Sequence, residues 1–425
     1  MLFIFIFFYS VIVYISLLKI NSNLIISPSF WLLISWGFIF GLYYTSGIKY
    51  KFSLNYLTSA YIFLILILFL IFYFFGINLK INKNRIDTIN YRKKIWTLLY
   101  FILSIFGIIL WIFDVLRLNN IIFGYRINNF SISIIGTLGM LFLNLALIVW
   151  LYELAYSINF NKRIPLKAYI SVIIYLVPAF VTSGRQPILI IVISTFIILV
   201  YSLKKNQNYK FKKTIKKFIL FGILSFFFYA IMISTKRAGV SNKAALFEEI
   251  FKSKTPVYLL DFTNSLEGLG EVILEAIYYY SHQLSMFEIF YNNYNGTKFW
   301  GLTQFHYIGR RFPDVYYQAQ TYIDITFSKV GVYSHVWITA IASFIIDYGR
   351  FGTTIFVSIL GFIIGRKRRK FNHIKTSYEL VFLTLICTGI AFSIQFSPFS
   401  ELSWAYPLYW LIVIPVFEII FKYKN

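Results

Sequence analysis

The sequence predicts an all-α protein that crosses a membrane many times. Hydrophobic residues make up 59% of its 425 residues and charged residues only 13%, and the mean hydropathy is +0.71. The apolar residues fall in runs, several of them near the length of about 20 residues that a helix needs to cross a bilayer. The net charge of +24 is concentrated in short Lys- and Arg-rich segments between these runs. This composition excludes a soluble globular protein.

Eleven apolar runs are expected to form membrane-spanning helices. They cover residues 2–18, 30–44, 56–77, 95–116, 132–156, 168–182, 187–203, 218–235, 351–365, 378–396 and 408–421. The first run lacks a preceding basic region and a small-residue cleavage site, so we interpret it as a retained span and not as a secretory signal. Cys387 is the only cysteine of the chain, which excludes a disulfide within it.

The basic clusters predict the orientation, because loops rich in Lys and Arg stay in the cytoplasm. Eleven spans place all of these clusters on one side, at residues 80–94, 162–167, 204–217, 366–375 and 422–424. The N-terminus and residues 236–350 then lie outside, and the C-terminus lies inside. Residues 336–348 are too short for a crossing and are expected to form a re-entrant or interfacial helix. Topology accounts for the Lys-rich runs, so no nucleic-acid partner is expected.

The chain therefore divides into N-terminal spans (1–235), one large extracytoplasmic loop (236–350) and C-terminal spans (351–425). Residues 236–352 contain ten acidic residues, ten basic residues and three of the four histidines. Polar residues kept beside membrane spans are often functional, so we look for chemistry in this loop. Apolar residues at helical spacing between Leu266 and Ile277 predict an amphipathic helix, and its polar face carries Glu267, Glu271 and Glu275.

Several basic residues oppose the topological bias because they are predicted on the outer side. They are Lys49, Lys51, Arg117, Arg126, Arg185, Lys236, Arg237, Arg310, Arg311 and Arg350. Arg185 ends the three-residue connector Ser183-Gly184-Arg185 between two spans. Arginine binds phosphate through paired hydrogen bonds with a permanent charge, so Arg185, Lys236–Arg237 and Arg310–Arg311 could together bind a diphosphate. The alternative is that Arg185 only reaches a lipid headgroup.

A metal site is not expected. His282, His306 and His335 match no short zinc motif in their spacing, and the connector at 45–55 has no acidic pair. A Gly-rich phosphate loop and a Ser-centred nucleophile motif are also missing from the sequence. The sequence therefore implies no cofactor.

Four segments resemble the bacterial oligosaccharide repeat-unit polymerases, the O-antigen polymerase or Wzy-type family. They are the Ser183–Arg185 connector, Gly301–Phe305, Tyr333–Thr339 and the Asp-aromatic-Gly-x-x-Gly element Asp347–Gly352. The resemblance covers about residues 170–370, with the span-like N-terminal part similar only in hydropathy. Gln186-Pro187 departs from the family, in which a second small residue often follows the arginine.

The resemblance implies a GT-C-like, metal-independent glycosyltransferase at the outer face of the bacterial inner membrane. Such an enzyme polymerises undecaprenyl-diphosphate-linked oligosaccharide units into a surface polysaccharide such as the O-antigen of lipopolysaccharide, a capsule or an exopolysaccharide. Its partners would be the lipid-linked donor and acceptor, the bilayer, and a chain-length regulator and flippase of the same pathway. An O-antigen ligase-like transferase, a non-enzymatic flippase and a scaffold subunit of the export machinery remain alternatives.

In this reaction a base must accept the proton of the attacking sugar hydroxyl. Histidine titrates near neutral pH, so His335 is the first candidate, with Asp347 orienting its ring. Glu267 and Glu271 are the alternative bases. His306 lies four residues before Arg310 and is a candidate phosphate or sugar contact, whereas His282 is interpreted as an interfacial residue.

Overall fold

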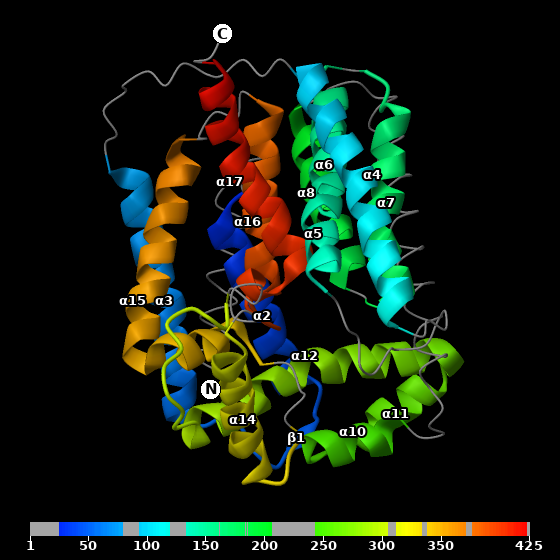
Figure 1. Cartoon of the computed structure of the whole chain (residues 1–425). Coiled ribbons are helices and arrows are strands. Elements are labelled where there is room, and N and C mark those ends of the chain that lie inside the picture. Colours follow the sequence, from blue (N-terminus) through cyan, green and yellow to red (C-terminus); the bar gives the residue numbers. More distant parts are fainter. Residues whose placement is uncertain are drawn as a thin grey trace. The chain divides into compact units, whose positions relative to one another are not determined.

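The protein is described by a computed structural model that is mostly helical (Figure 1). The structure describes residues 25–79, 93–119, 133–160, 162–182, 184, 186–205, 243–304, 312–333, 338–370 and 376–422. The chain forms two compact units that interleave along the sequence. Unit 1 contains Met1–Ile77, Phe228–Lys370 and Gly389–Glu401, and unit 2 contains Asn78–Phe227, Phe371–Thr388 and Leu402–Asn425. Unit 1 thus contains residues from all three predicted segments, the N-terminal spans, the large loop and the C-terminal spans.

The all-α, multi-pass character expected from the sequence is confirmed. In the part of the chain that the structure describes, four helices are long and apolar enough to cross a membrane, namely Tyr56–Asn78, Trp96–Leu118, Ile134–Asn159 and Ala340–Arg369. Shorter apolar helices are Leu166–Thr182, Gln186–Tyr201, Ser377–Phe392 and Leu402–Val413. The predicted runs 2–18 and 218–235 lie outside the described residues. The number of eleven crossings stays a prediction.

Unit 2 is built from apolar helices. They are α4 (Lys93–Leu118), α5 (Ile134–Leu143), α6 (Leu145–Asn159), α7 (Leu166–Thr182), α8 (Gln186–Lys205), most of α16 (Ser377–Phe392) and α17 (Leu402–Lys422). A half-buried ion pair joins α6 to α7, with Lys167 Nζ at 2.7 Å from Glu153 Oε1. The same ammonium donates to Thr97 Oγ1 of α4 at 2.7 Å. These two contacts satisfy a charge that would be costly among apolar helices if it were unpaired.

Unit 1 holds α2 (Pro28–Thr45), α3 (Tyr56–Asn78) and the helices that follow residue 242. The latter are α10 (Lys243–Phe251), α11 (Val257–Asn264), α12 (Glu267–Asn293), α14 (Pro313–Ser328) and α15 (Ala340–Lys370), with a 3-10 turn at Pro398–Ser400. The predicted amphipathic helix is the first part of α12. Glu271 is exposed there while Val272 and Leu274 are buried.

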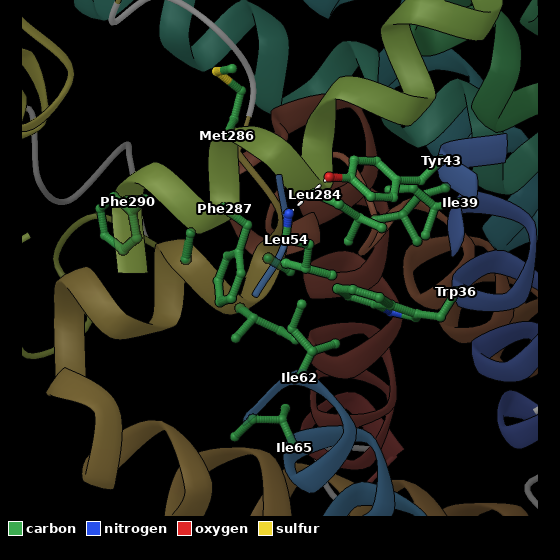
Figure 2. Packing of buried hydrophobic residues seen from close by; sticks show 14 of the residues in the cluster. Trp36, Ile39, Tyr43, Leu54, Ile62, Ile65, Leu284, Met286, Phe287 and Phe290 are labelled. Atoms are coloured by element: carbon green, nitrogen blue, oxygen red, sulfur yellow. Dashed lines mark hydrogen bonds between the residues drawn. The ribbon is translucent and has the colours of Figure 1, made fainter. Parts of the chain in front are cut away.

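The core of unit 1 surrounds the second part of α12, in which residues 281–290 are all buried. Figure 2 shows Leu284 and Phe287 of this helix near Tyr43 of α2, Ile62 of α3 and Leu54 of the connector before α3. Tyr43 also accepts a hydrogen bond from the Leu54 backbone N–H at 2.8 Å. Burying each large apolar side chain stabilises the fold by roughly 1.5–3 kcal/mol, so this cluster holds α2, α3 and α12 together.

Two short strands tie the connector between α2 and α3 to the large loop. Strand β1 (Lys49–Tyr50) pairs antiparallel with β2 (Ser253–Lys254), with Tyr50 opposite Ser253. Two side-chain hydrogen bonds add to the contact, from Ser285 Oγ to Phe52 O at 2.8 Å and from Tyr258 Oη to Ser46 O at 2.7 Å. The connector and the loop therefore lie at the same end of unit 1, as the predicted topology requires.

Helices α3 and α15 run parallel and touch along their length. Tyr61 Oη donates to Arg350 O at 2.8 Å at one end, and Arg369 Nη1 donates to Ile77 O at 2.6 Å at the other. Between them, a Cβ on Gly365 would lie 2.1 Å from Tyr73 O, which shows that the two backbones are in direct contact. Small residues permit such close helix packing. α15 ends inside the basic cluster that begins at Arg366, and α3 is followed in the sequence by the cluster that begins at Lys80.

α15 is broken at Gly349, whose φ of 70° and ψ of 174° are not helical. Residues with a side chain rarely adopt a positive φ of this kind, whereas glycine does so at little cost. The break separates a short helix at residues 340–348 from a long one at residues 350–370, which run in different directions (Figure 1). The short part corresponds to the segment that was too short for a crossing in the sequence.

Candidate functional site

The candidate site lies in unit 1 at the break of α15, where the chain at residues 298–304 approaches it. Backbone hydrogen bonds join the two segments, from Phe299 N to Ile346 O at 3.4 Å and from Trp300 N to Asp347 O at 2.9 Å. Trp300 has a φ of 52° and Gly301 a φ of 92°. A positive φ is unfavourable for tryptophan, so other contacts must hold this turn in place.

Asp347 provides those contacts. Its side chain is fully buried; Oδ1 accepts from Thr303 N at 3.2 Å, and Oδ2 accepts from Thr303 Oγ1 at 2.7 Å and from Gln304 N at 3.2 Å. Among the described residues, no basic side chain forms an ion pair with it. A buried carboxylate that accepts several hydrogen bonds holds the donating segment firmly in place. Asp347 therefore joins the 301–304 turn to the α15 break.

This anchor brings together two of the segments that resemble the polymerase family. The resemblance identified residues 301–305 and 347–352 separately, and the structure places 301–304 against Asp347. The predicted task of Asp347 was to orient the ring of His335, and His335 lies outside the described residues. That task stays a prediction, whereas the bonds to Thr303 and Gln304 indicate a positioning role.

Arg350 follows the break directly and is held by aromatic residues. Its guanidinium lies 4.4 Å from the centre of the Tyr291 ring, and Nη2 donates to Tyr291 O. The Tyr61 ring packs against Tyr291 with centroids 5.0 Å apart. An arginine over an aromatic face is stabilised by a cation–π interaction. Arg350 is thus an exposed but oriented cation at the start of the long part of α15.

Glu288 is a carboxylate of this region that the sequence analysis did not select. It is buried on α12, where Oε2 accepts from Asn55 N at 3.0 Å and Oε1 from Asn292 Nδ2 at 2.5 Å. Glu288 lies one helical turn before Tyr291, the residue that holds Arg350. Its position inside the apolar stretch Met286–Phe290 was the signal that could have identified it, because a buried carboxylate is costly unless it is hydrogen-bonded.

Other predicted site residues lie apart from the break or outside the described residues. Glu271 is exposed on the first part of α12, and Glu267 is the first residue of that helix. The other predicted site residues lie outside the residues that the structure describes, and they are Arg185, Lys236, Arg237, His306, Arg310, Arg311 and His335. The diphosphate site that all of these except His335 would form stays a prediction, and so does the role of His335 as the base. Among the described residues, no group of three or more His, Cys, Asp and Glu residues could hold a metal ion.

The interpretation of His282 as an interfacial residue is wrong. The imidazole is 1% exposed and stacks on the Phe251 ring with centroids 4.1 Å apart. Nδ1 lies 2.6 Å from Tyr278 O; because a carbonyl only accepts, Nδ1 carries the proton. Burial lowers the pKa of His282 to about 4 from its ordinary value of 6.5, and the bond to Tyr278 O opposes this shift. The residue is a neutral part of the core.

The lowered pKa of His282 predicts acid-sensitive stability. Between pH 6.5 and 4 the unfolded chain binds a proton that the folded chain does not, so stability falls as the pH falls through this window. A shift from 6.5 to about 4 corresponds to about 3 kcal/mol lost between these two pH values. Melting temperatures in detergent at pH 7.5 to 4.5 would measure the loss. His282→Phe keeps a ring against Phe251 and should flatten this dependence; an equal slope in both proteins would contradict the prediction.

Comparisons with known proteins identify no family for this chain. No protein-family model matches the chain, and no curated protein or solved structure matches it. The functional assignment therefore rests on the sequence and on the residues of the site.

Proposed function

We propose that the protein is a membrane glycosyltransferase that polymerises undecaprenyl-diphosphate-linked oligosaccharide units into a surface polysaccharide. The observation that supports this most is the Asp347 anchor, because it joins two segments whose sequences resemble the same polymerase family. The anchor lies at the start of an apolar helix long enough to span a membrane. Exposed cations and aromatic side chains surround it, as a lipid-linked sugar diphosphate would require.

The proposed reaction moves the growing glycan from its lipid carrier to a new unit. A hydroxyl on the new lipid-linked unit attacks the anomeric carbon of the growing chain, and the bond between that carbon and the diphosphate breaks. The diphosphate leaves with the electron pair, and a base accepts the hydroxyl proton. His335 is the proposed base, with Glu267 and Glu271 as alternatives. Arg185, Lys236–Arg237 and Arg310–Arg311 would stabilise the charge that develops on the diphosphate, with His306 as a further contact.

We place this reaction at the outer face of a bacterial inner membrane, with a GT-C-like arrangement of about eleven spans. The basic clusters would then be cytoplasmic, the N-terminus outside and the C-terminus inside. The parallel arrangement of α3 and α15 supports this topology, since α3 precedes one basic cluster and α15 ends inside another. The pairing of β1 with β2 supports it as well, because both strands belong to segments assigned to the outer side.

Two measurements test the proposal against its alternatives. Deleting the gene should reduce the surface glycan to single repeat units. A ligase would instead leave long chains on the lipid carrier, and a flippase would leave no glycan on the outer side. Purified protein given lipid-diphosphate-linked units should lengthen them, also in the presence of EDTA. If His335→Ala remains folded and inserted and lengthens chains like the wild type, His335 is not the base.

A further inference from the structure

We infer that the break of α15 binds the phosphate of a lipid with a net negative charge through Lys298 and Arg350, with the Trp300 ring nearby. Neither cation belongs to the proposed diphosphate site. The inference requires only that the protein lies in a membrane and does not depend on polymerase activity. All residues of this site belong to unit 1.

The first argument is the position of the break relative to the apolar helices. α3 and the long part of α15 begin at the same end of unit 1, where Tyr61 meets Arg350. Their first residues are strongly exposed, with Phe351 at 78%, and Tyr56 and Leu57 both at 71%. Exposed apolar residues at the start of a span are expected to contact lipid, and the residues just before them lie at the level of the headgroups. Arg350 is placed at that level.

The second argument is the pair of cations at the break. Lys298 passes over Gly349, where a Cβ would lie 2.9 Å from Lys298 Cε and 3.7 Å from Nζ. The ammonium therefore lies beside the residue that precedes Arg350, and both cations are exposed. In the described part of the chain no carboxylate forms an ion pair with either of them. Two cations at the same break that form no ion pair among the described residues attract an anionic phosphate at headgroup level.

The nearby carboxylates do not neutralise this pair. Asp347 is buried and bound to Thr303 and Gln304, and Glu288 is buried and bound to Asn55 and Asn292. The negative charges of the region are thus inside unit 1 and bound by neutral donors, while its two positive charges face outward.

The third argument is that the site is partly ordered before a ligand binds. The Tyr291 ring and carbonyl fix the guanidinium of Arg350, and a guanidinium has five N–H donors, so others remain for a phosphate. Trp300 is 76% exposed on a turn that the Asp347 anchor holds. Tryptophan prefers the membrane–water interface because its ring is apolar and its N–H is polar. A lipid headgroup could therefore be bound between the cations and this ring.

The test measures lipid binding to the full-length protein in phosphatidylcholine nanodiscs. Phosphatidylglycerol and undecaprenyl phosphate are titrated into wild type, into the double variant K298Q/R350Q and into the control K49Q/K51Q. The control removes two exposed cations near the same end of unit 1. At about 1 kcal/mol for each basic residue near an anionic lipid surface, the double variant should bind about 30-fold more weakly. The control should bind like the wild type.

The arms of this experiment separate the possible ligands. Weaker binding of both lipid phosphates by K298Q/R350Q indicates a general headgroup site, and weaker binding of undecaprenyl phosphate alone assigns the site to the carrier lipid. Wild-type affinity in the double variant, or an equal loss in K49Q/K51Q, overturns the inference. Inorganic pyrophosphate that binds as tightly as the lipids would also overturn it, since the site would then serve a soluble anion. K298Q alone, which changes one exposed side chain, should show a smaller loss with an unchanged melting temperature.

Discussion

Asp347→Asn is expected to lower the free energy of unfolding of unit 1 by about 3 kcal/mol, since each hydrogen bond to a charged group contributes about 1.5–3 kcal/mol. Three donors point at the Asp347 carboxylate, and two of them are backbone N–H groups of Thr303 and Gln304. Asparagine has only one acceptor oxygen, and its NH₂ group would face a donor. The turn that presents Trp300 should then lose its position, and we expect polymerisation to fall by about 100-fold.

Thermal unfolding in detergent and the length of the glycan made in vitro would measure both effects. Asp314→Asn is the matched control, because Asp314 is exposed in the first turn of α14. Thr303→Val removes one of the three bonds and should have an intermediate effect. Its effect should not add to that of Asp347→Asn, since the two residues share a contact. A melting temperature equal to the wild type in Asp347→Asn would show that the anchor is not needed.

Arg185→Ala is expected to reduce polymerisation by about 100-fold or more, because a bidentate contact that strengthens in the transition state is lost. Arg185→Lys should restore little, since an ammonium cannot form the paired hydrogen bonds of a guanidinium. The measurement is chain extension of lipid-diphosphate-linked units by purified protein. Arg163→Ala is the matched control. Arg163 is an exposed arginine just before α7, whereas Arg185 comes just after that helix in the sequence. Near-normal chain lengths in Arg185→Ala would remove this residue from the diphosphate site.

Much of the fold could be predicted because apolar runs mark helices directly. The second part of α12 shows where this approach fails, since Ser281, His282 and Gln283 suggest a surface position but are buried. Their side chains bond to carbonyls one turn earlier in the same helix, for example Ser281 Oγ to Ile277 O at 2.6 Å and Gln283 Nε2 to Tyr279 O at 3.2 Å. Such bonds within the helix lower the cost of burying polar side chains, and Ser281 Oγ also lies 2.6 Å from Tyr50 Oη of β1, a contact that the sequence does not reveal.

The candidate site was predictable only in part. The sequence drew attention to residues 301–305 and 347–352, but the contact between them joins positions 44 residues apart and has no local signal. The strands β1 and β2 have two residues each, so they depend on tertiary pairing and leave no alternating pattern. Glu288 was missed because helical spacing drew attention only to the carboxylates in the first part of α12. Its place inside the apolar stretch Met286–Phe290 was a local sign, but its hydrogen bond to Asn55, 233 residues away, could not be read from the sequence.

The parallel contact of α3 with α15 has a consequence for how the protein is made. Tyr61 and Arg350 are 289 residues apart, which at about 5–20 residues per second corresponds to roughly 15 to 60 s of synthesis. During that time α3 has no partner for the surface around Gly76, Phe69 and Tyr73 that later meets α15. Most of unit 2 is translated in this interval, since Asn78–Phe227 lies between the two helices in the sequence. The ribosome therefore begins unit 1 first but can close its α3–α15 contact only after most of unit 2 has been made, so the apolar surface of α3 must be covered by lipid or by another protein until then.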